Sequence, residues 1–121
     1  MALRTGDEVR DVAVADLDGD GRDEVLAAGF SHNVTCFSGM GKRLWRRDLG
    51  APVAHVVPVE QDGTRIIAAV TRSGQIATLD AEGNLLAWRD LASEPTALTH
   101  IGSDIVVATA AGKVVRLRLV P

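Results

Sequence analysis

The feature that most constrains this chain is an internal repeat with a period of 42 residues. Shifted by that period, the 121-residue sequence aligns with itself without a gap. Asp20-Gly21 then falls on Asp62-Gly63, and similar apolar residues fall on one another along the whole overlap. A third, shorter copy begins near Pro95. Repeats of about 40 to 45 residues are typical of the blades of a β-propeller, so the period predicts stacked blades.

Each full repeat contains four apolar segments separated by Gly, Asp or Asn turns, which predicts four short strands. In the first repeat these segments are Asp11–Leu17, Glu24–Gly29, Val34–Ser38 and Arg43–Leu49. The second segment of every copy is continuously apolar, as expected for a strand that neighbouring blades cover on both faces. No segment longer than about ten residues has a helical period, so the chain is predicted to be all-β.

The predicted organisation is one propeller domain, 1–121, with blades at 9–50, 51–92 and 93–121. The third copy supplies only three strands, so the segment 2–8 is predicted to be a fourth strand. Propellers typically have about four to eight blades, so three do not close a ring. We therefore expect a six-bladed homodimer in which each segment 2–8 completes the third blade of the other copy. A fragment of a longer propeller, an engineered half-ring and a larger ring are the alternatives.

Residues 16–24 form the most distinctive short motif. Asp16, Asp18 and Asp20 alternate along the chain, and Gly19 and Gly21 permit the positive φ angles of a tight loop. Carboxylate oxygens that converge on one point suit Ca²⁺, whereas without a cation the three charges would repel one another. An EF-hand is excluded, because its twelfth position would be an alanine and the flanking segments are predicted strands. An Asp/Gly-rich hairpin that binds no metal is the alternative.

The segment Ala15–Val25 resembles the calcium loop of FG-GAP/VCBS repeats, the blades of integrin-like propellers. The resemblance implies one structural Ca²⁺ per chain, in the loop between the first two strands of the first blade, and a secreted or cell-surface setting. In the second repeat the 42-residue shift places Pro58 on the first ligand position, which is therefore lost. The ligands that the resemblance implies are the carboxylates of Asp16, Asp18, Asp20 and Glu24 and the backbone carbonyl of Arg22.

Composition excludes several other classes of function. The net charge is −3 and no run of Lys or Arg occurs, so no nucleic-acid partner is expected. No apolar run approaches the roughly 18 residues of a membrane span, so no membrane insertion is expected. Cys36 is the single cysteine, which leaves no intrachain disulfide and predicts a buried, inert thiol. Trp45 and Trp88 differ by one register position, so one is expected to face a neighbouring blade and the other solvent or a partner.

These observations favour a non-enzymatic structural and protein-interaction scaffold with no catalytic residues. Its protein partner is unidentified, and the loops opposite the calcium loop are expected to bind it. The alternative is a hydrolase or lyase that uses the axial pocket of an assembled propeller. The strand starts that would line that pocket are mostly Val, Ala and Leu, with His55 the exception. The residues expected on the partner face are Phe30, Ser31, His32, Asn33, Arg72, Ser73, 50–52 and 92–95.

Overall fold

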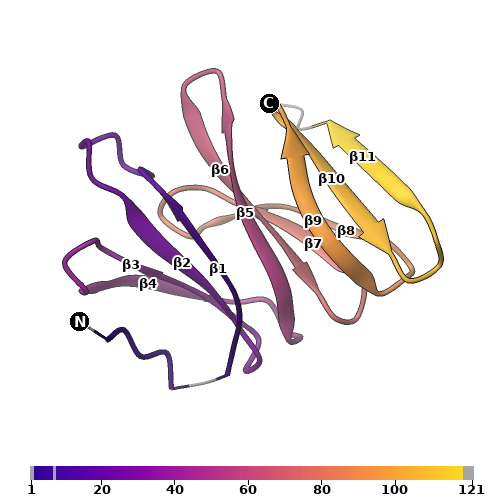
Figure 1. The fold of residues 1–121 in the computed structure, drawn as a ribbon, viewed down its shortest axis with the longest axis horizontal. Helices are drawn as coiled ribbons and strands as arrows, with labels where there is room; N and C mark the ends of the chain where they lie inside the picture. The colour runs from indigo at the N-terminus through magenta and orange to yellow at the C-terminus, as the bar shows by residue number, and fades with distance from the viewer. Residues whose placement is uncertain (1, 7, 119–121) are drawn as a thin grey trace.

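The computed structural model describes residues 2–6 and 8–118; positions 1, 7 and 119–121 are outside the description. In this part of the chain eleven strands form three antiparallel sheets that stand side by side in chain order (Figure 1). No helix long and apolar enough to cross a membrane occurs among the described residues. The prediction of an all-β fold is confirmed. The strands are β1 (Val9–Ala15), β2 (Glu24–Gly29), β3 (Asn33–Phe37), β4 (Arg43–Asp48), β5 (Val53–Gln61), β6 (Thr64–Thr71), β7 (Gln75–Leu79), β8 (Leu85–Asp90), β9 (Pro95–Ile101), β10 (Asp104–Thr109) and β11 (Val114–Arg118).

Each sheet is a meander in which consecutive strands are hydrogen-bonded neighbours. The first two sheets have the orders β1-β2-β3-β4 and β5-β6-β7-β8, and the third has three described strands, β9-β10-β11. The first strands of the sheets lie together, because β1 contacts β5 and β5 contacts β9. The sheets therefore pack face against face and fan out from a common line of first strands (Figure 1).

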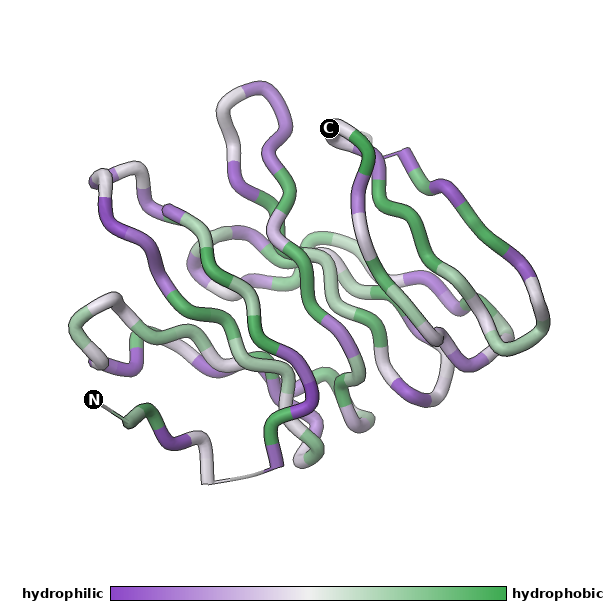
Figure 2. Tube along the Cα trace, in the orientation of Figure 1, coloured by the Kyte–Doolittle hydropathy of each residue, from purple (hydrophilic) through white to green (hydrophobic). Residues whose placement is uncertain are grey.

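The core consists of two layers of apolar side chains, one in each space between sheets. Leu26, Val34 and Cys36 of the first sheet pack with Ile67 and other residues of the second. The second layer joins residues such as Val70 and Ile76 to Ile105 and Val107 of the third sheet. Figure 2 shows hydrophobic residues along the strands of the sheets and hydrophilic residues at several turns. Because β6 of the second sheet contributes to both layers, its continuous apolar sequence is explained.

The strand register corrects the gapless alignment of the repeats. Val12 pairs with Ala27 and Val56 pairs with Ala69, so the first strands are related by 44 residues and the second strands by 42. Between the equivalent pairs Ala15–Glu24 and Val59–Ile66, the first sheet therefore has two more residues than the second. Because side chains alternate with a period of two, the shift leaves every residue on its predicted face. In the second sheet a tight turn replaces the long loop, with positive φ at Asp62 (50°) and Gly63 (80°).

The segment 2–8 is predicted as a strand of another copy's third blade. Residues 2–6 form no strand within the single chain. Residue 8 accepts a hydrogen bond at its carbonyl from Phe30 N (2.9 Å), which ties the end of this segment to the first sheet. Its pairing with a second copy stays a prediction.

Candidate metal site

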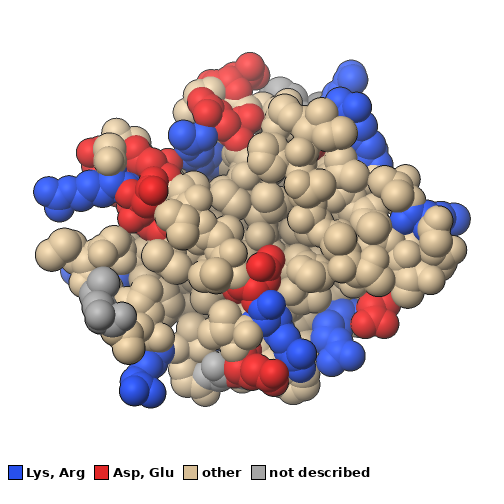
Figure 3. Space-filling model, in the orientation of Figure 1, with Lys and Arg blue, Asp and Glu red and all other residues tan. Residues whose placement is uncertain are grey.

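The loop between β1 and β2 brings together four of the predicted ligands. One carboxylate oxygen from each of Asp16, Asp18, Asp20 and Glu24 lies within 4.8 Å of all the others. Figure 3 shows acidic side chains gathered over this turn at the upper left of the molecule. The fifth predicted ligand, Arg22, lies exposed in the same loop, and its backbone N–H donates to Asp20 Oδ1 at 2.8 Å.

Backbone N–H groups of the loop shape the acidic cluster. Asp16 accepts from Gly19 N through Oδ1 and from Gly21 N through Oδ2, both at 2.9 Å. Asp18 Oδ1 accepts from Asp20 N at 3.1 Å. Both glycines have positive φ, 77° at Gly19 and 84° at Gly21, which L residues with a side chain adopt at a cost. The alternation of Asp and Gly therefore folds the loop around its own carboxylates.

Glu24 differs from the other acids because it is buried, with 3% of its surface exposed. Its Oε1 accepts from Leu17 N at 2.8 Å and from Asp18 N at 3.3 Å. These bonds compensate for the removal of the carboxylate from water. Leu17 itself belongs to the core layer between the first two sheets. Glu24 thus connects the exposed loop to the interior of the protein.

The pKa values of Asp16 and Asp18, which lie two residues apart in the loop, are shifted in opposite directions. Partial burial raises the pKa of Asp16, but the N–H groups of Gly21 and Gly19 outweigh it and hold that pKa below its usual value. The N–H of Asp20 lowers the pKa of Asp18, but burial and the adjacent Asp20 carboxyl outweigh it and raise that pKa. The cluster therefore contains a carboxylate that its like-charged neighbours destabilise. Hard oxygen donors crowded in this way match the ligand preference of Ca²⁺.

The side chain of Arg65, in the second sheet, connects the β1–β2 loop to that sheet. Arg65 Nε donates to the backbone carbonyl of Asp16 at 3.0 Å, and its Nη1 lies 2.6 Å from Glu60 Oε2. Sequence reasoning missed Arg65, because nothing in the local sequence links positions 49 residues apart. The loop therefore belongs to the contact between the first two sheets as well as to its own hairpin.

The expected partner face lies at the opposite ends of the strands, as the meander order requires. The exposed ring of Phe30 lies 5.1 Å from the guanidinium carbon of Arg10, a cation–π contact. Arg72 Nε lies 3.9 Å from Glu94 Oε1, which is a solvent-exposed ion pair. The face therefore offers an aromatic side chain beside Arg10 and a separate exposed ion pair.

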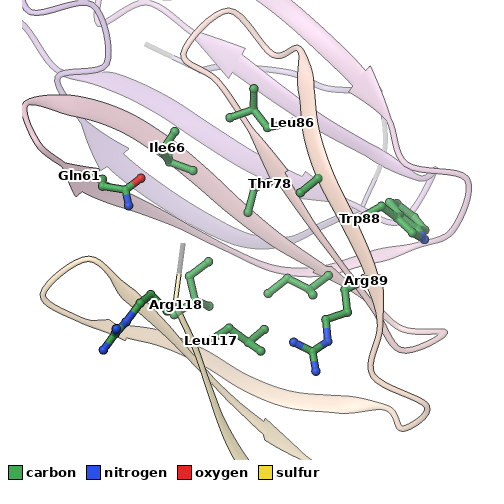
Figure 4. A pocket seen from close by; sticks show the side chains of 11 residues that line it. Gln61, Ile66, Thr78, Leu86, Trp88, Arg89, Leu117 and Arg118 are labelled. Atoms are coloured by element: carbon green, nitrogen blue, oxygen red, sulfur yellow. The ribbon is translucent and has the colours of Figure 1, made fainter. Parts of the chain in front are cut away.

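A cavity of about 490 Å³ lies between the second and third sheets (Figure 4). Arg89 of β8 and Leu117 of β11 lie on opposite sides of it, and Arg118 lines it from the end of β11. None of the described residues that line the cavity carries a carboxylate, an imidazole or a thiol. This lining contains no acid–base pair for hydrolysis or elimination.

Meandering sheets that fan out from a line of first strands, with an acidic loop at one end, define a β-propeller protein. Residues 4–114 match the lambda-carrageenase β-propeller domain, and the chain belongs to that family. The prediction of propeller blades is confirmed. The matched family is not described by the FG-GAP/VCBS name, so the resemblance of the acidic loop to those repeats stays a prediction.

Solved propellers have the same fold. The chain is similar to BBS1N, crystallised in complex with ARL6DN, with a TM-score of 0.73 and 15% identity over 98% of this chain and 41% of that one. It is also similar to BamB from Moraxella catarrhalis, with a TM-score of 0.64 and 23% identity over 79% of this chain and 30% of that one. The chain thus spans about two fifths of BBS1N and less than a third of BamB. No curated protein sequence matches the chain.

Proposed function

We propose that this chain is a structural and protein-interaction module of a β-propeller, in which one Ca²⁺ staples the loop between β1 and β2. The observation that carries the proposal is the convergence of four carboxylates within 4.8 Å. Asp16, Asp18, Asp20 and Glu24 would supply side-chain oxygens, and Arg22 would supply its backbone carbonyl. Such an all-oxygen set suits Ca²⁺ better than a transition metal.

A structural role follows from what the loop touches. Leu17 is buried in the core layer between the first two sheets, and Asp16 O accepts the hydrogen bond from Arg65 of the second sheet. A bound cation would neutralise the repulsion among the aspartates and thereby stabilise both contacts. Its stabilising effect would then extend from the hairpin to the packing of two blades.

The interaction role rests on the opposite face, where Phe30 and Arg72 are exposed. Phe30 lies against Arg10, and an exposed aromatic ring beside an arginine is the type of feature that protein interfaces favour. A propeller of similar fold, BBS1N, was crystallised in complex with ARL6DN, which supports partner binding as a use of this architecture. We also propose that two copies assemble into a six-bladed ring.

An enzymatic role is the second candidate, and the observation in its favour is the family, which is named for a lambda-carrageenase. That name describes a propeller domain. The cavity between the second and third sheets of this chain has no acidic or basic catalyst in its described lining. The scaffold role is preferred because the clustered carboxylates of the β1–β2 loop are a structural feature that this chain itself carries.

Thermal unfolding in Ca²⁺, Mg²⁺ and EDTA tests the calcium staple. A ligand that binds only the folded state at about 100 times its Kd adds about 2.7 kcal/mol, which raises the Tm by on the order of 10 °C in a domain of this size. We expect this rise in Ca²⁺. Asp18→Asn should abolish the rise, and should slightly increase the Tm in EDTA because it removes one repelling charge.

Asp62→Asn is the matched control, because it makes the same substitution in the short turn of the second sheet. This variant should keep the full response to Ca²⁺. A wild-type Tm that is the same in Ca²⁺ and EDTA would contradict the proposal. A response that Asp18→Asn retains would place the ion elsewhere.

A further inference from the structure

The two outer faces of the three-sheet stack expose apolar side chains at positions that are buried inside it. Val12 of the first sheet is 58% exposed, whereas Val56, its equivalent in the second sheet by strand pairing, is 4% exposed. Val114 of the third sheet is 74% exposed, whereas its equivalent Ile76 is 4% exposed. We name these surfaces the leading face (with Val12 and Val14) and the trailing face (with Ile101 and Val114).

Two of the charged side chains on the trailing face, Arg116 and Asp104, are paired with each other, and Arg118 lies at the end of β11. Its pairing register puts Arg116 opposite Val106, with Asp104 two residues further along the same strand. Arg116 Nε donates to Asp104 Oδ2 at 2.8 Å, so the two charges neutralise each other within the face. The face therefore combines exposed apolar side chains with an internal ion pair, a mixture that protein interfaces also have.

The edge of the third sheet is open beside this face. The strands β3 and β7 each pair with a fourth strand, β4 and β8 respectively. Among the described residues, β11 pairs only with β10. An unpaired edge of this kind offers backbone N–H and C=O groups to another strand.

The backbone of the segment before β1 resembles that of the two segments that connect β4 to β5 and β8 to β9. Gly6 has a φ of 77°, and the residues at the corresponding place before β5 and β9 are Gly50 at 78° and Ala92 at 57°. The carbonyl of Glu8 accepts from Phe30 N at 2.9 Å, just as Pro52 O and Glu94 O accept at 2.8 Å in the next two sheets. Residues 2–4 therefore occupy the same position before β1 that the last residues of β4 and β8 occupy before β5 and β9.

We propose that the edge of β11 and the trailing face bind a second copy of this chain. The second copy lays its leading face on the trailing face, and its residues 2–4 run antiparallel along β11. Each copy carries both halves of this contact, so a twofold ring satisfies both. The inference rests on the homodimer proposed above and states which residues of the two copies are paired. Arg47 pairs with Val34 and Arg89 with Ile76, so Leu3 of one copy should lie opposite Val114 of the other.

Disulfide trapping between singly substituted chains tests this register. Directly opposed residues of paired strands have Cα atoms about 4.5–5.5 Å apart, within the range of a disulfide. Leu3→Cys and Val114→Cys proteins are mixed and oxidised, and denaturing non-reducing electrophoresis measures the cross-linked product. We expect a product of twice the chain mass from the mixture. Native Cys36 is buried and does not compete.

Mixing Leu3→Cys with Met40→Cys is the matched control, because Met40 is exposed in the β3–β4 turn, away from β11. It should give no cross-link above that of either protein alone. Light scattering on the unmodified chain separates the two proposals. A dimer without the Leu3–Val114 cross-link overturns the strand register and leaves the homodimer standing, whereas a monomer overturns both. Circular dichroism of each variant verifies that the sheets are intact.

Discussion

At the scale of single residues, Cys36 shows how packing controls chemistry. Burial, reinforced by the negative charges of Glu24 and Asp18, raises the pKa of its thiol from 9.0 to about 12. The reactive thiolate is therefore on the order of 1000 times scarcer at pH 8 than in the unfolded chain. We expect the native protein to resist a thiol-specific reagent, and the protein in denaturant to react with one equivalent.

Met40→Cys provides the exposed reference thiol, which should react at once in the folded protein. Rapid labelling of Cys36 without denaturant would contradict this interpretation. The raised pKa also fixes the sign of its effect on stability. The folded state holds the proton longer, so this contribution is complete below pH 9.0 and is lost as the pH rises toward 12.

At the scale of elements, one tryptophan fastens the first blade to the second. Trp45 of β4 donates through Nε1 to Ala81 O at 2.8 Å in the β7–β8 turn of the next sheet. Its ring lies against Gly83, where a Cβ would approach a ring carbon to 2.5 Å and where φ is 83°. Arg47 Nε donates to Gly83 O at 2.7 Å. A glycine is required at this turn by both the ring and the backbone.

Replacing the two tryptophans separates the packed ring from the exposed one. Trp45→Ala removes a hydrogen bond and the contact with the next blade, so we expect the free energy of unfolding to fall by about 3 kcal/mol. Trp88→Ala should cost less than about 1 kcal/mol, because this ring is half exposed. Urea denaturation measures both values. Equal losses would show that Trp45 does not hold the blades together.

The sequence could predict that one tryptophan faces a neighbouring blade, because the two side chains are one register position apart and strand faces alternate. It could not predict the extra two residues between β1 and β2. A shift of two preserves every face, so the hydrophobic pattern fits both alignments equally well. It also could not predict the bond from Arg65 to Asp16, since that contact depends on how two blades pack. The hydrophobic period of the sequence predicts the strands. The contacts between strands of different sheets also depend on the loop lengths and on how the sheets pack.

At the scale of the whole molecule, the period of the repeat was sufficient to predict the class of fold. Blades stack because each sheet must cover both faces of its middle strands. The same requirement applies to the leading and trailing faces, which the described residues of a single chain leave open. If these two faces hold the copies of the ring together, a charge placed on one of them should separate the copies.

Val12→Arg places a charge on the leading face, at the position where Val56 is buried in the second sheet. Burying an unpaired guanidinium is costly, so the contact between copies should be lost. We expect sedimentation velocity to show a dimer for the wild type and a monomer for Val12→Arg, with unchanged circular dichroism because Val12 is exposed in the single chain. Met40→Arg, which places the same charge in the β3–β4 turn, should remain a dimer. If Val12→Arg also sedimented as a dimer, the copies would have to meet through another surface, and the leading face would need a different partner.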